Sequence, residues 1–165
     1  MSVAEGDKAP DFSMAASNGR TVTLKGQMGK PFVLYFYPKA DTPGCTKEAC
    51  GFEESLPQFK GPMGGIDVIG VSPDAMPPIE KFAKKYNLTF PLASDLDHAV
   101  ATAYGVWKEK SMYGKTYMGI ERSTFLMDGK GKIAKAWRRV KVDGHAAEVM
   151  AAAAALIPTP LMIDR

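Results

Sequence analysis

Both cysteines of the chain lie in one short segment, Pro38 to Cys50, whose sequence is PKADTPGCTKEAC. The segment follows an apolar run and precedes a pattern typical of a helix, so we expect Cys45 in the first helical turn. There the helix dipole and several unpaired backbone N–H groups favour a thiolate over a thiol. Cys45 is therefore a candidate nucleophile. Gly44 beside it lets a small substrate approach the backbone, where the N–H groups of both residues could bind a negatively charged oxygen.

The spacing between the two cysteines bears on whether they can pair. On an ideal helix, five residues rise about 7.5 Å and turn about 140°, which places the two Cα atoms about 8.7 Å apart, beyond the ~7 Å limit for a disulfide. A Cys45–Cys50 bridge would therefore require the helix to open locally. Redox sites with the closer Cys-x-x-Cys spacing need no such opening. Taken alone, Cys50 fits equally well a residue that simply packs against the core.

A strand, a tight loop and a helix are expected to position these cysteines. Phe32 to Tyr37 are six consecutive apolar or aromatic residues, typical of a strand buried on both faces in the middle of a sheet, and Pro38 ends it. Thr42 suits the N-cap of a helix and Pro43 its first position. We expect this helix to continue to Gly61. Its apolar face recurs at helical spacing, at Phe52, Leu56 and Phe59.

The remaining pattern alternates strands and helices. An N-terminal hairpin is expected around Asn18-Gly19, between Phe12–Ala16 and Thr21–Leu24. The further expected elements are strands at Ile66–Val71, Ser123–Asp128 and Ile133–Val140, helices after Asp74, at Asp97–Tyr104 and at Gly144–Leu156, and a polar connection over Lys108–Gly119. This order fits an α/β sandwich of the thioredoxin type, although other α/β folds share it. We expect one domain over residues 1–165, with 157–165 as a short C-terminal extension.

Composition excludes several classes of protein. The chain has 165 residues, of which 45% are hydrophobic and 24% charged, and its net charge is +3. A chain of this size can bury about 70% of its surface on folding without help from a disulfide or a metal. Two cysteines are too few for a disulfide-stapled scaffold or for a zinc-ribbon site, which needs four soft ligands. The basic residues are scattered, which argues against binding of nucleic acid.

Location and cofactors follow from further features of the sequence. The first twelve residues contain Glu5 and Asp7 and lack the basic start and apolar core of a signal peptide, so we expect a cytoplasmic protein. The longest apolar run, Val149 to Ile157, is far shorter than the ~20 residues that span a bilayer. His98 and His145 stand alone without a local ligand partner, and we expect neither a metal nor another cofactor.

The segment around Cys45 also resembles a known family. The pattern Pro-x-x-x-Thr-x-x-Cys, here Pro38, Thr42 and Cys45, is similar to the active-site signature of peroxiredoxins. The longer string FYPKADTPGCTKEACGF resembles the bacterioferritin-comigratory, or Q-type, subfamily. Further matching strings follow in order: KAPDF, GVSPD, FPLASD, YGVW and ERSTFLMD. The resemblance covers roughly residues 3 to 156 and implies a thioredoxin-like fold with a central mixed sheet and an N-terminal hairpin.

The resemblance implies a role for each matching residue. Cys45 would be the peroxidatic cysteine, which attacks the terminal oxygen of a hydroperoxide and becomes a sulfenic acid. Thr42 would hydrogen-bond the thiol or the peroxide oxygens, and Pro38 would shield the sulfenate from over-oxidation. The arginine of the family corresponds to Arg122, whose donors would favour the thiolate and stabilise charge on the leaving oxygen.

Cys50 corresponds to the resolving cysteine of the two-cysteine members. It would form an intrachain disulfide with Cys45 that thioredoxin or a similar dithiol reduces. Members of the subfamily are usually monomers and sometimes dimers. Two other functions stay open: a thiol-disulfide oxidoreductase acting on proteins, which the wide cysteine spacing disfavours, and a binding or chaperone-like protein whose cysteines only sense oxidation.

Overall fold

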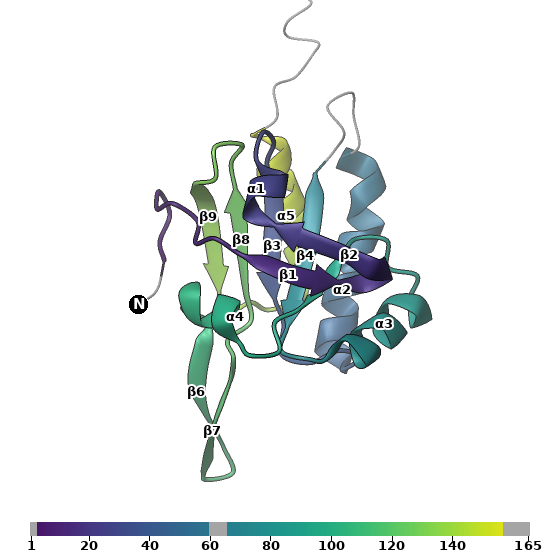
Figure 1. Cartoon of the computed structure of the whole chain (residues 1–165), viewed down its shortest axis with the longest axis vertical. Helices are drawn as coiled ribbons and strands as arrows, with labels where there is room; N and C mark the ends of the chain where they lie inside the picture. The colour runs from purple at the N-terminus through teal and green to yellow at the C-terminus, as the bar shows by residue number, and fades with distance from the viewer. Residues whose placement is uncertain (1–2, 60–65, 157–165) are drawn as a thin grey trace, which may run out of the picture.

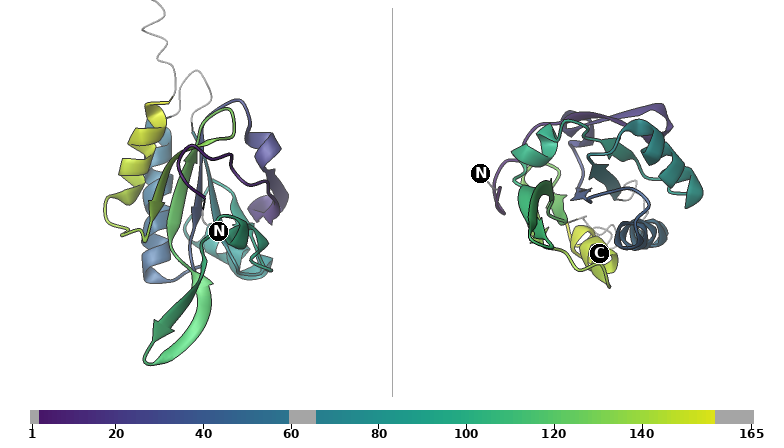
Figure 2. Two further views of the ribbon diagram at one scale, coloured as in Figure 1. Left: turned by 90° about the vertical axis from the view of Figure 1, so that its left-hand side faces the viewer. Right: turned by 90° about the horizontal axis from the view of Figure 1, so that it is seen from below.

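The computed structural model describes residues 3–59 and 66–156. Within these residues a seven-stranded mixed sheet has the order β2-β1-β5-β4-β3-β8-β9, and a separate two-stranded sheet, β6-β7, projects from one end (Figure 1). Helices α2 and α5 lie side by side on one face of the large sheet (Figure 2). No helix in the described part of the chain is long and apolar enough to cross a bilayer.

The strands and helices have the following bounds. The strands are β1 (Ser13–Ala16), β2 (Arg20–Thr23), β3 (Phe32–Phe36), β4 (Asp67–Ser72), β5 (Leu92–Ser94), β6 (Trp107–Met112), β7 (Lys115–Ile120), β8 (Ser123–Met127) and β9 (Ile133–Arg138). The helices are α1 (Leu24–Gln27), α2 (Pro43–Ser55), α3 (Met76–Lys85), α4 (Ala99–Ala103) and α5 (His145–Ala154), with short 3-10 turns η1 (Ser17–Gly19) and η2 (Leu56–Phe59).

Strand β3 is the buried strand that leads to the cysteines. It pairs in parallel with β4 and antiparallel with β8, and all five of its residues are buried, as the continuous apolar run predicts. Its side chains alternate between the two faces of the sheet. Tyr35 points to the face covered by α2 and stacks on Phe52 of that helix with ring centroids 4.7 Å apart. A Cβ at Gly70 would lie 2.9 Å from Tyr35, so a glycine on β4 makes room for this ring.

The predicted element order is largely confirmed. The Asn18-Gly19 hairpin joins β1 to β2, and the strands and helices expected after residue 66 occur within one or two residues of their predicted ends. The helix expected up to Gly61 is wrong in its length, because α2 ends at Ser55 and a 3-10 turn follows. Pro57 explains the end, since proline lacks the N–H that a continuing helix needs. Gly61 and the expected extension 157–165 lie outside the described residues.

Four elements are absent from the sequence prediction: the short helix α1 and the strands β5, β6 and β7. The polar stretch Lys108–Gly119 forms the hairpin β6–β7, whose Tyr113-Gly114 turn has positive φ angles of 53° and 77°, the conformation that matches the twist of a hairpin. Along most of their length its strands are exposed or half-buried on both faces, so no alternation of buried and exposed residues marks them in the sequence. Strand β5 has only three residues, which is too short to show a period.

Candidate active site

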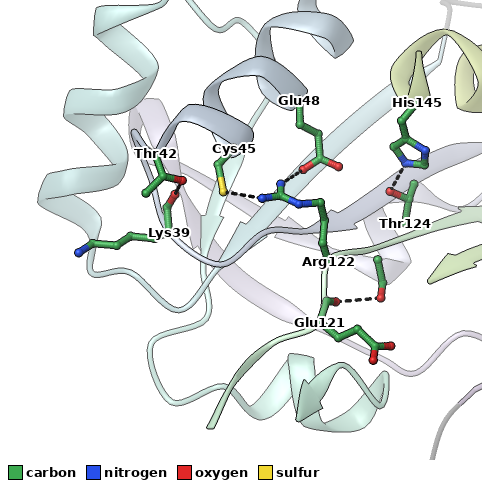
Figure 3. Close-up of polar contacts among 9 residues, drawn as sticks. Lys39, Thr42, Cys45, Glu48, Glu121, Arg122, Thr124 and His145 are labelled. Carbon is green, nitrogen blue, oxygen red and sulfur yellow. Dashed lines mark hydrogen bonds and ion pairs between the residues drawn. The ribbon is translucent and has the colours of Figure 1, made fainter. Parts of the chain in front are cut away.

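The loop from Pro38 to Thr42 carries the chain from β3 into α2. Thr42 is the N-cap residue by its extended backbone and Pro43 is the first helical residue, as predicted. The Thr42 side chain does not cap the helix, however. Its hydroxyl donates to the carbonyl oxygen of Lys39 at 3.1 Å (Figure 3). Cys45 is the third residue of α2 and is only 1% exposed.

Two aspartates, Asp74 outside the loop and Asp41 within it, hold the loop in place. The N–H of Ala40 donates to Asp74 Oδ2 at 2.7 Å, and Asp74 lies just after β4. Asp41 has a positive φ of 60° and accepts hydrogen bonds from Lys85 at 3.0 Å and Tyr86 at 2.8 Å. These contacts fix the loop to the end of β4 and to α3. Sequence reasoning missed both roles, because each depends on a contact between distant segments.

Arg122 lies beside the Cys45 sulfur. It occupies the short link between β7 and β8, and its Nη2 donates to Cys45 Sγ at 3.2 Å (Figure 3). The two residues are 77 positions apart in the sequence. A Cβ at Gly44 would lie 3.3 Å from Arg122 Nη2. Glycine at this position therefore leaves room for the guanidinium, in addition to the substrate access expected from the sequence.

Glu48 completes the site and was not predicted. It lies three residues after Cys45 on the same side of α2, and its Oε1 accepts from Arg122 Nη1 at 2.6 Å. The side chain is fully buried, and Oε2 has no hydrogen-bond partner among the described residues. Burial raises the pKa of Glu48 to about 7, although the charge of Arg122 acts in the opposite direction. The helical i, i+3 spacing from Cys45 was the signal that could have identified it.

Cys50 is half-buried on the same unbroken helix, and both cysteines are free. Burial is the main cause that raises the pKa of the Cys50 thiol, with Glu54 and Glu53 adding to it. Cys50 also borders a cavity of about 310 Å³ between α2 and the start of α5. Because α2 is continuous through both cysteines, the helix must open before the two sulfurs can meet.

The two histidines have structural contacts. His145 is buried at the start of α5, where its Nε2 lies 2.8 Å from Thr124 Oγ1 and its ring meets Phe52 edge-on (Figure 3). Burial lowers the pKa of His145 to about 4. His98 stacks on Trp107 with ring centroids 4.0 Å apart. Within residues 3–59 and 66–156, no three side chains of the ligating types gather to hold a metal.

Cys45 lies at the start of a helix that packs on a mixed sheet, and a guanidinium donates a hydrogen bond to its sulfur. This combination defines a thiol-based redox enzyme of the thioredoxin-like class. Residues 5–136 match the AhpC/TSA family, and the chain belongs to this family. It is 49% identical over 150 residues to a putative peroxiredoxin bcp of Coxiella burnetii, covering 91% of this chain and 98% of that protein. Peroxiredoxin Bcp of Bacillus subtilis is also 49% identical, with 91% and 94% covered.

Solved structures agree with this assignment. A mutant of Xylella fastidiosa PrxQ superposes with a TM-score of 0.86 at 40% identity, covering 94% of this chain and 98% of that one. A Xanthomonas campestris bacterioferritin comigratory protein, described with its alkyl peroxide reduction activity, gives 0.81 at 45% identity, with 87% and 90% covered. The predicted peroxiredoxin resemblance and thioredoxin-like fold are thus confirmed, and the chain is a thiol-dependent peroxidase.

We expect the titration of Glu48 to affect stability. A carboxyl whose pKa is near 4.5 when unfolded and about 7 when folded stabilises the folded protein below pH 4.5, and this contribution is lost as the pH rises through 7. Wild type should therefore lose roughly 1 to 3 kcal/mol relative to Glu48→Gln between pH 5 and pH 7.5. Urea unfolding of both reduced proteins across this range measures the difference. His145 acts in the opposite direction in both proteins and cancels, so a constant difference would contradict the raised pKa.

Proposed function

We propose that Cys45 is the peroxidatic cysteine, that Cys50 resolves it, and that thioredoxin or a similar dithiol protein reduces the resulting disulfide, with hydrogen peroxide and organic hydroperoxides as substrates. The observation that carries the proposal is Arg122 Nη2 at 3.2 Å from Cys45 Sγ, at the start of α2. The alkyl peroxide reduction ascribed to the Xanthomonas campestris protein supports the organic substrates.

In the first step the Cys45 thiolate attacks the terminal oxygen of ROOH. An S–O bond forms, the O–O bond breaks, and the alcohol ROH leaves with the proton that the terminal oxygen carried, so that Cys45 becomes a sulfenate. Negative charge moves from sulfur toward the leaving oxygen during the attack. Arg122 already donates a hydrogen bond to the sulfur, and its guanidinium can also stabilise the negative charge that develops on the leaving oxygen. The hydroxyl of Thr42 can orient the peroxide if it turns from Lys39, and Pro38 shields the sulfenate.

In the second step the Cys50 thiol attacks the protonated Cys45 sulfenic acid. An S–S bond forms, and the hydroxyl leaves as water with the proton from Cys50. The raised pKa of Cys50 keeps it a thiol while α2 is intact, so opening of the helix both frees its sulfur and brings it into water. A protein dithiol then exchanges with the disulfide, is itself oxidised, and restores two thiols.

The proposed cycle also agrees with the oligomeric state and the location that the sequence predicts. Because one chain carries both cysteines, a monomer suffices for the whole reaction, and we propose a monomer as the working unit. We likewise propose a cytoplasmic location, where thioredoxin keeps cysteines reduced. Seven of the nine strands in the described residues belong to one sheet, which supports a single domain.

Replacing Cys50 tests the two-cysteine cycle. After one equivalent of hydrogen peroxide, wild type should lose two hydrogens in mass, whereas Cys50→Ser should gain one oxygen. NADPH consumption through thioredoxin and its reductase should proceed with wild type and fall at least tenfold with Cys50→Ser, because the variant offers thioredoxin no disulfide. A wild-type protein that instead holds a persistent sulfenic acid would show a one-cysteine mechanism with an external thiol.

The same NADPH assay distinguishes a peroxidase from the competing function, a thiol-disulfide oxidoreductase acting on proteins. A thiol-disulfide oxidoreductase would reduce a protein disulfide such as that of insulin without added peroxide. We expect wild type to raise NADPH consumption above the rate of thioredoxin and its reductase alone with hydrogen peroxide and with tert-butyl hydroperoxide, and not to raise it with insulin in place of the peroxide.

A further inference from the structure

The hairpin β6–β7 projects from the end of the molecule at which α2 begins, beside the site (Figure 1). Its base is joined to the site through the chain, because β7 ends at Ile120 and Arg122 follows two residues later. The function described above assigns no role to this hairpin. Four of its large apolar side chains are nevertheless exposed: Met112, Tyr113, Tyr117 and Met118.

The pairing of the two strands separates the charges between the faces of the hairpin. Directly paired residues share a face, and the pairs Lys108 with Gly119, Lys110 with Tyr117, and Met112 with Lys115 lie on one of them. All three lysines of the two strands are on this face, whereas the acidic residue of the hairpin, Glu109, is on the other. We call the set Lys108, Lys110, Met112, Lys115 and Tyr117 the basic strip.

The basic strip is directed toward the site at its inner end. Lys110 is half-buried, and desolvation lowers the pKa of its ammonium group. The charge of Arg122 acts in the same direction, whereas those of Cys45 and Glu121 raise this pKa. The face of the hairpin opposite the strip is directed toward the protein core at the hairpin's base. There Ile120 and Trp107 pack in the hydrophobic cluster that includes residues of α4. A partner that lies on the strip is therefore brought next to Cys45.

We propose that the basic strip is the docking surface for an acidic protein dithiol, the reductant of the Cys45–Cys50 disulfide. The inference rests on the proposed function. Three lysines outnumber the one carboxylate near their face, Glu121 just beyond the base of the hairpin, and so complement a negatively charged partner. Tyr117 and Met112 supply apolar contact area between them. The strip extends about 13 Å along β6, from Lys108 to Met112. This is longer than a small peroxide molecule, so the strip suits a protein rather than the peroxide. A surface of this size suits a redox encounter, which is small and short-lived because the partner must leave after each turnover.

The lysines at the two ends of the strip, Lys108 at its base and Lys115 near its turn, test this assignment. In Lys108→Glu/Lys115→Glu, the second-order rate at which reduced thioredoxin reduces the peroxide-oxidised protein should fall about tenfold or more at low ionic strength. The fall should shrink at about 0.5 M salt, because salt screens the charges. Lys130→Glu/Lys132→Glu is the matched control, since these exposed lysines lie in the β8–β9 turn at the other end of the sheet (Figure 1). It makes the same change of net charge.

Other measurements separate the docking step from the rest of the cycle. Oxidation by hydrogen peroxide and reduction by dithiothreitol should keep wild-type rates in both double variants. An equal loss in both variants, a loss with dithiothreitol, or no loss in the hairpin variant would overturn the docking surface. A change of oligomeric state on gel filtration in the hairpin variant, with the thioredoxin rate unchanged, would assign the strip to a second copy and overturn it too. If wild type is not oxidised by peroxide at all, the proposed function fails instead.

Discussion

Substitution of Cys45 by serine should abolish the reaction with peroxide, with a fall in the second-order rate on the order of 10³-fold or more. The physical reason is that a serine hydroxyl is a far weaker nucleophile than a cysteine sulfur and stays protonated at neutral pH. Arg122 and the N–H groups of the first helical turn then have no nucleophile to act upon.

The measurement is stopped-flow fluorescence of the two tryptophans after mixing with micromolar hydrogen peroxide. Trp137 lies edge-on to His145, which packs edge-on to Phe52 of α2, so changes in that helix should alter its emission. Cys50→Ser is the matched control, because it removes the other sulfur on the same helix and should keep the fast oxidation. A fast phase that persists in Cys45→Ser would show that another group reacts with peroxide.

The local part of this site could be predicted from the sequence, and the distant part could not. Pro38, Thr42, Gly44 and Cys45 are neighbours in the chain, so a strand, a proline and a helix start were enough to place them together. Arg122 is 77 positions away, and only the family resemblance pointed to it. The contact of Asp74 with Ala40 joins two segments that the parallel pairing of β3 and β4 brings together, and no local pattern records such pairing.

The fold shows the same division between local and tertiary information. Buried strands such as β3 give a continuous apolar run, and the amphipathic α3 gives a clear period. The hairpin β6–β7 has no buried face along most of its length, so its strands carry no such signal, although the Tyr-Gly pair at its turn is typical of a hairpin. Glu48 was missed for a related reason. A carboxylate on a helix is usually exposed, and the burial of Glu48 depends on its contact with Arg122, which lies in the distant link between β7 and β8.

Removal of the Arg122 guanidinium should give the second large effect, a fall of about 10²- to 10³-fold in the rate of oxidation by peroxide. In Arg122→Met the hydrophobic stem remains while both donors are lost, the one to Cys45 and the one to Glu48. The loss has two consequences that must be separated. The thiolate and the leaving oxygen lose their donor. Glu48 loses the charge that lowers its pKa, so its pKa rises further and it is left protonated and buried without its partner, which can cost about 1 to 3 kcal/mol of stability.

The double variant Arg122→Met/Glu48→Gln separates these consequences. A neutral amide at position 48 removes the carboxyl that must take up a proton on folding, so the free energy of unfolding at pH 7 should recover much of its loss, whereas the oxidation rate should stay low because no donor reaches the sulfur. Arg139→Met controls for loss of a positive charge, since Arg139 is 87% exposed and lies 3.7 Å from Glu121. Stopped-flow oxidation and urea unfolding are measured on all three proteins. If the rate recovered together with stability in the double variant, Arg122 would act by balancing the charge of Glu48, and its contact with Cys45 would not be what accelerates the reaction.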